Sequence, residues 1–187
     1  RGELGEILAQ REDIKRIVNC DLSFLMAALS PKPRLVADEE SLPFQNNCFD
    51  MVTSLLSLHW VNDLPSALVE VARCLKPDGL FLLHTIGKNV SDTAADPWIS
   101  KYIFPNGEVP SISQIGQALE QKFVCEDFHN FGAYYDKTLM AWFENFDAAW
   151  PQLKSQFDDE FYRMWKYYLL SCAGAFRARD IQLWQWV

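Results

Sequence analysis

The chain has 187 residues, of which 49% are hydrophobic and 22% are charged. This composition is typical of a folded globular domain and excludes a disordered chain, and no apolar run approaches the roughly 18 residues that a membrane-spanning helix needs. The 17 basic and 25 acidic residues give a net charge of −8, which argues against a nucleic-acid partner with a broad interface.

Apolar residues in the first half of the chain alternate between strand and helix patterns. We expect helices at 3–10, 23–29 and 64–75, and buried strands at 16–20, 34–37, 49–56 and 80–85. The turn Pro77-Asp78-Gly79 ends the third helix. Alternation of this kind predicts a doubly wound α/β fold, in which a parallel sheet carries helices on both faces. Ligands of such sheets bind beyond the carboxyl ends of the strands, so the residues after each strand are candidates for function.

The second half is richer in aromatic residues and holds six of the seven tryptophans. Residues 88–111 have a loop-like composition, and Ser111 with Gln114 forms a capping-box pattern that opens a helix to about residue 121. We further expect a strand at 123–131, helices at 137–149 and 155–175, and a strand at 181–187. These elements complete a single domain over 1–187.

The cysteines and histidines form no metal-binding pattern. The cysteines lie at 20, 48, 74, 125 and 172 without C-x-x-C spacing, and the histidines are scattered at 59, 84 and 129. We therefore expect free thiols in a reducing, cytoplasmic compartment and no metal ion.

Acidic residues follow two of the predicted strands. Asp21 could accept hydrogen bonds from the vicinal hydroxyls of a ribose, and Asp38, one strand later, could contact an adenine amino group. A solvated loop acid or a helix cap is the alternative for each. Their order in the chain favours a nucleotide-like ligand.

The tract DEESLPFQNNCFDMVTSLLSLHWVNDLPSALVEVARCLKPDGLF, residues 38–81, carries a more specific pattern. It resembles the class I methyltransferases that use S-adenosylmethionine, and within them the branch of complex I assembly factors and biotin-pathway carrier-protein methyltransferases. The resemblance implies a Rossmann-like fold and a cofactor site that includes Gly2, Asp21, Asp38, Glu39 and Ser54.

The same family has a Gly-rich loop after its first strand, where backbone amides approach the methionine carboxylate. The sequence starts at Arg1-Gly2-Glu3-Leu4, where that loop would be ending. By this comparison the first strand and most of the loop are lacking, and Gly2 is a remnant of the loop.

From about residue 80 the sequence resembles a different branch. The blocks FLLHTIGKNVSDTAADPWISKYIFPNGEVP, GAYYDKTLMAWFENF and FYRMWKYYLLSCAGAFRARD are similar to cyclopropane-fatty-acyl-phospholipid synthase. This family adds a methylene group from S-adenosylmethionine to a cis double bond of a phospholipid acyl chain, with a bound bicarbonate ion as base. The resemblance implies that His84, Ile86 and Tyr135 hold the bicarbonate, and that Cys172 lines the catalytic pocket with His84 and Tyr135.

One family residue has no counterpart. The synthases have a Glu in a Phe-Glu-His segment after the central strand, whereas the matching stretch here is Ser57-Leu58-His59-Trp60. Ser57 or Leu58 therefore occupies the position of that carboxylate. Taken singly, His84 and Cys172 also fit structural roles, in a satisfied strand end and in close helix packing.

Three functions remain open at this stage. The chain resembles a join of two branches near 76–79, with a cofactor-binding half at 1–79 and a substrate-binding half at 80–187. We expect cyclopropane formation on unsaturated phospholipids. The alternatives are methyl transfer to a protein or a carrier-protein ester, and a catalytically impaired fragment.

Basic residues alternate with aromatic ones late in the chain. Arg163, Lys166, Arg177 and Arg179 interleave with Phe161, Tyr162, Trp165, Tyr167 and Tyr168. Such a surface could rest on anionic lipid at the inner face of a membrane. Inward packing of the aromatics is the alternative, and a homodimer is left open.

Overall fold

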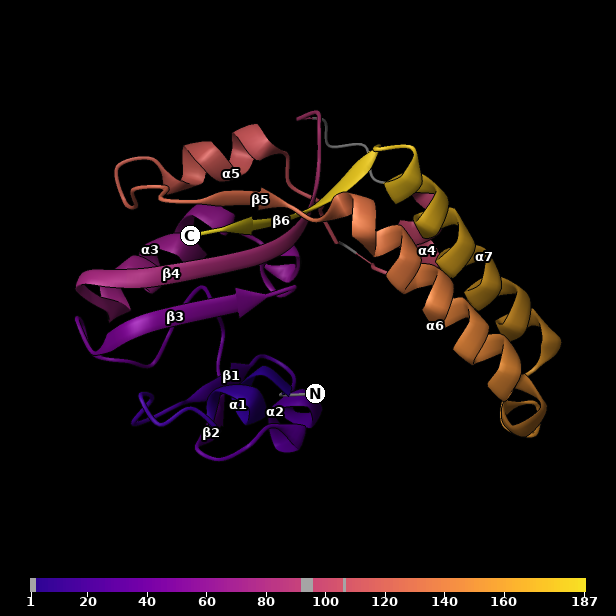
Figure 1. Cartoon of the computed structure of the whole chain (residues 1–187), viewed down its shortest axis with the longest axis horizontal. Helices are drawn as coiled ribbons and strands as arrows, with labels where there is room; N and C mark the ends of the chain where they lie inside the picture. Colours follow the sequence, from indigo (N-terminus) through magenta and orange to yellow (C-terminus); the bar gives the residue numbers. More distant parts are fainter. Residues whose placement is uncertain (1–2, 92–95, 106) are drawn as a thin grey trace.

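The computed structural model describes residues 3–91, 96–105 and 107–187. Its first part is a small parallel sheet of β1 (Asn19–Asp21) and β2 (Arg34–Val36), accompanied by helices α1 (Glu3–Leu8) and α2 (Phe24–Leu29). This small sheet lies beyond β3, at the edge of the main sheet (Figure 1).

The main sheet has four strands in the order β3-β4-β6-β5. They are β3 (Phe49–Leu55), β4 (Leu75–Lys88), β6 (Ile181–Trp186) and β5 (Phe128–Asn130). β3 and β4 are parallel, whereas β6 is antiparallel to both β4 and β5. The mixed α/β fold with a central sheet is confirmed, and the parallel pairing expected in the first half is found for β3 and β4. Only β6 runs in the opposite direction in this sheet, because β5, antiparallel to β6, has the same direction as β4. The helical hairpin between β5 and β6 returns the chain to the end of β5, so β6 runs back antiparallel to β5.

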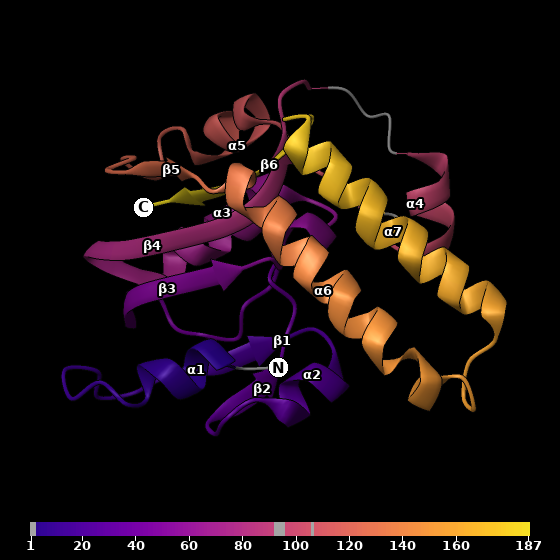
Figure 2. The ribbon, with the colours of Figure 1, turned by 45° about the vertical axis from the view of Figure 1, so that its right-hand side comes forward.

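Helices cover both faces of the main sheet. Helices α3 (Leu64–Cys74) and α5 (Ile112–Leu119) pack on one face, and the long hairpin of α6 (Gly132–Leu153) and α7 (Asp159–Arg177) extends from the other (Figures 1 and 2). The alternation of side chains along a strand produces these two layers, because successive residues point to opposite faces. On β6, Trp184 belongs to the core under α3 and α5, and Leu183 belongs to the core under α6 and α7.

Local sequence explains where the covering helices begin. Asp63 caps α3 by accepting a hydrogen bond from the Ser66 amide, and the predicted capping box of Ser111 and Gln114 opens α5. Ala67, Leu68 and Val71 are buried on one face of α3, as its amphipathic pattern predicts. Both caps satisfy amides that would otherwise lack partners at a helix start.

Several boundaries differ from the sequence prediction. The predicted loop over 88–111 contains helix α4 (Pro97–Tyr102), which Asp96 caps at the amides of Trp98 and Ile99. An Asp followed by Pro is a helix-start signal, so this helix was detectable in the sequence. The predicted strand at 123–131 contains only β5, and α6 begins earlier than expected, directly after Phe131.

The predicted turn at 77–79 lies inside β4 rather than before it. Phe49 pairs with Leu75 and Met51 pairs with Leu80, so the residues between Leu75 and Leu80 bulge out of the ladder. Asp78 has a φ of 63° there, which is consistent with a turn. No helix in the described part of the chain combines the length and apolar character that a membrane crossing requires.

Candidate active site

The site lies where the parallel strands end. Asp21 is the last residue of β1, Asp38 comes two residues after β2, and Ser57 comes two residues after β3. Asp21 pairs with Val36, so the ends of β1 and β2 are adjacent. The edge predicted from the sequence for a ligand is therefore formed by these loops.

The two aspartates each use one oxygen locally. Asp21 accepts a hydrogen bond from the Ser23 amide at 2.8 Å, and Asp38 accepts one from the Glu40 amide at 2.9 Å. The second carboxylate oxygen of each has no partner among the described residues. Two carboxylates with free oxygens at neighbouring strand ends fit the hydroxyl and amino groups of an adenosine.

Glu39 connects the small sheet to the main sheet. Its carboxylate accepts a hydrogen bond from the Ser57 hydroxyl. Burial, followed by the charges of Glu39 and Asp21, raises the pKa of the Cys20 thiol to about 11, so these groups lie close together. Ser57 and Leu58 are the two residues that could occupy the position of the missing family carboxylate. Leu58 is buried in the core, whereas Ser57 contacts a carboxylate, that of Glu39 from the loop after β2.

Ser54, the remaining predicted cofactor residue in the described part of the chain, lies near the end of β3. It pairs with Leu83, and its hydroxyl is buried without a partner in the described part of the chain. Ser54 shares a strand face with Val52, which packs against the core under α3 and α5. Its side chain therefore lies on the opposite face of the sheet from His84. Gly2 lies outside the described residues.

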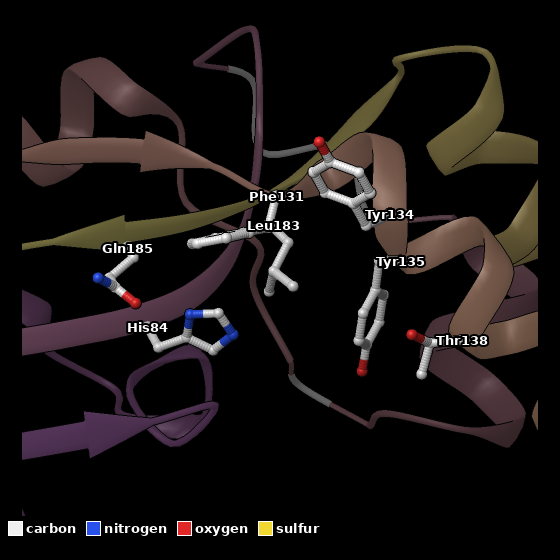
Figure 3. Close-up of a pocket in the computed structure, with 7 residues that line it drawn as sticks. All are labelled: His84, Phe131, Tyr134, Tyr135, Thr138, Leu183 and Gln185. Atoms are coloured by element: carbon white, nitrogen blue, oxygen red, sulfur yellow. The ribbon is translucent and has the colours of Figure 1, made fainter.

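His84 and Tyr135 line one cavity of about 280 Å³. His84 comes from β4, between Leu55 of β3 and Gln185 of β6, and Tyr135 comes from the first turn of α6. Figure 3 shows both rings pointing into the space between β4 and α6, with Phe131 and Leu183 between them.

Both rings are neutral hydrogen-bond donors. Burial lowers the pKa of His84, and burial together with the charge of Cys172 raises the pKa of Tyr135. Neither the imidazole nor the phenol has a hydrogen-bond partner among the described residues. An imidazole N–H and a phenol O–H that face one cavity fit a small oxyanion, which accepts from both.

Ile86 and Cys172 border the same region. Ile86 lies two residues after His84 and therefore on the same face of β4, and both Ile86 and Cys172 pack against the core under α6 and α7, as Tyr135 does. Burial, followed by the charge of Asp96, raises the pKa of Cys172 to about 11. The thiol is therefore protonated at neutral pH.

Tyr168 belongs to this group and follows the inward-packing alternative for the aromatic residues of α7. Burial and then the charges of Cys172 and Tyr135 raise its pKa, and its ring packs on Trp165 and Phe104. Tyr168 and Cys172 are four residues apart on α7, which is the spacing of one helix face. That spacing was the available signal.

Of the two alternatives for the aromatic residues of α7, inward packing holds for some of them and solvent exposure for others. Trp165 packs inward, Tyr162 donates a hydrogen bond to Asp147, and Arg177 forms a bidentate ion pair with Asp136. Tyr167 remains 54% exposed. The helix is amphipathic, so only part of its aromatic content reaches solvent.

Comparison with known proteins gives two overlapping family matches. The model of the mycolic acid cyclopropane synthetases matches residues 44–186, and the model of a methyltransferase domain matches residues 1–83. A cyclopropane-fatty-acyl-phospholipid synthase of Escherichia coli K12 is 55% identical over 142 residues, which are 75% of this chain and 37% of that protein. The mouse mitochondrial arginine-hydroxylase NDUFAF5 is 62% identical over 52 residues, which are 28% of this chain and 15% of that protein.

Solved structures agree on the fold. The cyclopropane synthase MmaA2 from Mycobacterium tuberculosis superposes with a TM-score of 0.83 at 23% identity, over 98% of this chain and 72% of that chain. The architecture is that of the class I S-adenosylmethionine-dependent methyltransferases. The chain spans little more than a third of the length of the Escherichia coli synthase.

Proposed function

The chain belongs to the mycolic acid cyclopropane synthetase family, and on that premise we propose that it transfers a methylene group from S-adenosylmethionine to a cis double bond of an unsaturated phospholipid. The cavity shared by His84 and Tyr135 carries this proposal. It offers the neutral imidazole of His84 and the phenol of Tyr135 beside the apolar side chains of Phe131 and Leu183. The polar side chains of Tyr134, Thr138 and Gln185 complete the lining.

The reaction requires such a cavity. The π electrons of the alkene attack the methyl carbon of the sulfonium, the carbon–sulfur bond breaks, and S-adenosylhomocysteine leaves with that electron pair. The alkyl cation then loses a proton from the transferred carbon, and the released electron pair closes the ring. A bicarbonate ion, when bound, supplies the base for this proton.

The chain's own residues hold the anion and protect the cation. His84 and Tyr135 donate hydrogen bonds toward the anion, and the backbone of Ile86 borders it. The rings of Tyr135 and Tyr168 present electron-rich faces to the cation and exclude water that would trap it. Cys172 packs against the same core as Tyr135 and stays a protonated thiol, which is a poor nucleophile toward the cation.

We assign the cofactor's adenosine to the strand ends, with Asp21 at the ribose and Asp38 at the adenine. Glu39 holds the Ser57 loop beside them through the hydrogen bond from the Ser57 hydroxyl. This division assigns the cofactor to the half at 1–79 and the lipid to the half at 80–187. We further propose a cytoplasmic protein that meets its substrate at a membrane surface, with a homodimer as its assembly.

The direct test uses methyl-labelled S-adenosylmethionine and vesicles of a monounsaturated phospholipid. We expect labelled cyclopropane acyl chains by mass spectrometry, and none from vesicles of the saturated lipid. Absence of product in a protein that binds S-adenosylhomocysteine would overturn the proposal.

The methyltransferase-domain match over residues 1–83 favours a second candidate, methyl transfer to a protein or to a carrier-protein ester. The matching relative NDUFAF5 is itself named an arginine-hydroxylase. The identity to this relative is 62% over 52 residues, so this stretch of the chain is closely similar to a protein outside the cyclopropane synthases. Label transferred to a protein or carrier ester without any lipid would support this candidate, and strict dependence on unsaturated vesicles would exclude it.

A further inference from the structure

A second cavity, of about 350 Å³, lies between α4 and α7, which run beside each other (Figure 2). It is lined by Trp98 and Tyr102 of α4 and by Glu160, Arg163, Met164 and Tyr167 of α7. None of these residues lines the cavity of His84 and Tyr135. Neither the reaction nor the adenosine site makes use of it.

Aromatic rings form its wall. Trp98 lies edge-on to Tyr167 with ring centroids 4.5 Å apart, and it packs on Tyr102 at 5.5 Å. Tyr102 and Tyr167 are 47% and 54% exposed. The Lys101 ammonium already lies over the Tyr102 ring, 4.8 Å from its centroid. The Tyr102 ring thus already has a cation of the protein itself, and the rings of Trp98 and Tyr167 are those that can attract an organic cation of a ligand.

Opposite charges stand together on the other side of this cavity. Glu160 and Arg163 are three residues apart on α7, so their side chains leave the same helix face roughly 5–6 Å apart. Neither has an ion pair or a hydrogen bond within the described part of the chain. A ligand that carries an anion next to a cation can engage both: a phosphate suits the guanidinium, and an ammonium suits the carboxylate and the rings.

The cavity also lies at a suitable distance from the catalytic group. Tyr167 is followed by Tyr168, and Phe104, just after α4, packs on Tyr168. From Arg163 to Cys172, α7 advances about 14 Å at 1.5 Å per residue. In a bilayer, the middle of an acyl chain lies roughly 12 Å from the level of the head groups. One lipid can therefore reach both places.

We propose that the cavity between α4 and α7 binds the zwitterionic head group of the lipid substrate, an ammonium linked to a phosphodiester as in phosphatidylethanolamine. This assignment rests on the proposed function for its biological role. Arg163 takes the phosphate, and Glu160 with the rings of Trp98 and Tyr167 takes the ammonium. Glu160 also disfavours head groups that carry only negative charge.

The first test is a competition in mixed vesicles that hold equal amounts of phosphatidylethanolamine and phosphatidylglycerol with the same monounsaturated chains. The wild-type chain should convert the ethanolamine lipid preferentially, and Glu160→Gln should reduce this preference about fivefold. Arg163→Gln should slow the conversion of both lipids, because both contain the phosphodiester. Asp159→Asn, on the same helix but outside the cavity, is the matched control for Glu160→Gln. An unchanged product ratio in an active Glu160→Gln variant would overturn the proposal.

A binding measurement separates this proposal from the proposed function, since it needs no turnover. Short-chain phosphatidylethanolamine, added without S-adenosylmethionine, should change the fluorescence of Trp98, and the Trp98→Phe variant should lack that change. Glycerophosphoethanolamine added alone tests for a free zwitterion: binding equal to that of the lipid would identify a soluble ligand instead. Equal binding of short-chain phosphatidylglycerol would contradict the head-group assignment even if cyclopropane formation is confirmed.

Discussion

Burial sets the charge state of the side chains around the catalytic cavity. His84 and Tyr135 come from a strand and a helix that are distant in the chain, and each lacks a hydrogen-bond partner in the described part of the structure. Both side chains are partly buried at the cavity, so their unused donors are available to a ligand that can accept hydrogen bonds from them. The phenol and the imidazole are therefore the residues whose replacement should matter most for activity.

The phenol donor can be removed without changing the packing. Tyr135→Phe retains the edge-to-face contact of the ring with Phe176, whose centroid lies 4.9 Å away, but it removes the O–H. We expect the rate of product formation to fall roughly a hundredfold, with little change in thermal stability. Phe143→Leu on the same helix is a control for repacking. An unaltered rate in Tyr135→Phe would show that the phenol does not hold the anion.

The two buried histidines should make stability depend on pH. Burial lowers the pKa of both His84 and His59, so near pH 6.5 and below the unfolded chain binds protons that the folded chain does not. The contribution of the two neutral imidazoles to the free energy of unfolding is fully present above about pH 6.5, the pKa of histidine in the unfolded chain. It is lost as the pH falls through the lower pKa values that the two histidines have in the folded chain. We expect the urea midpoint to drop between pH 7 and pH 5, and to drop less in the double variant His59→Gln/His84→Gln. An equal drop in both proteins would contradict this assignment.

At the level of elements, β4 separates the two functional layers. One face of β4 contributes to the core under α3 and α5, and the opposite face, toward α6 and α7, presents His84 and Ile86. β6 packs against β4 at Gly87, where the Trp184 ring fills the space that a Cβ would need. The Trp184 ring of β6 can pack this closely on β4 only because residue 87 is a glycine.

Replacement of two glycines, the buried Gly87 and the partly exposed Gly116, should have opposite effects on stability. In Gly87→Ala the new Cβ would overlap the Trp184 ring, and we expect a loss of about 1–3 kcal/mol in the free energy of unfolding. In Gly116→Ala, within α5, nothing lies within 4 Å of the added atom, and we expect a gain of about 0.5–1 kcal/mol. Urea denaturation of both variants measures the contrast. Equal effects would mean that β4 and β6 are not in this register.

In the whole molecule, the adenosine site is shared by two separate sheets. The bond from Ser57 to Glu39 and the bonds from Asn62 to Glu40 join the loop after β2 to the loop after β3. The substrate elements extend from the opposite side as the α6–α7 hairpin (Figure 2), which the Asp136–Arg177 ion pair ties together near its base. Binding of the cofactor at the loops after β2 and β3 should therefore stabilise the packing of the small sheet against the main sheet.

S-adenosylhomocysteine should raise the stability of the folded chain. At a concentration one hundred times its dissociation constant, the expected gain is about 2.7 kcal/mol, which a thermal-shift assay detects. Asp21→Asn should lose most of this gain at the same ligand concentration, because it weakens acceptance from the ribose hydroxyls. Asp13→Asn is the control, since Asp13 is exposed and pairs only with Arg11. If the ligand raised the melting temperature of Asp21→Asn as much as that of the wild-type chain, Asp21 would not be part of the cofactor site.

The amino-acid sequence alone determined the α/β class, the two branches of resemblance and most of the helices, because caps and apolar periods are local features. The capping box at Ser111 and the amphipathic face of α3 are examples. It also named His84 and Tyr135, through motifs rather than through any physical signal in the residues themselves.

Only the tertiary structure decided which groups meet. It turned Tyr168 inward, placed Ser54 on the far face of the sheet, brought Glu39 to Ser57, and set Glu160 and Arg163 opposite Trp98. These contacts join residues that are remote in sequence, and strand pairing and helix packing fix them after the local elements have formed. Local patterns carry no information about such pairings, which is why the antiparallel return of β6 and the second cavity could not be predicted from the sequence.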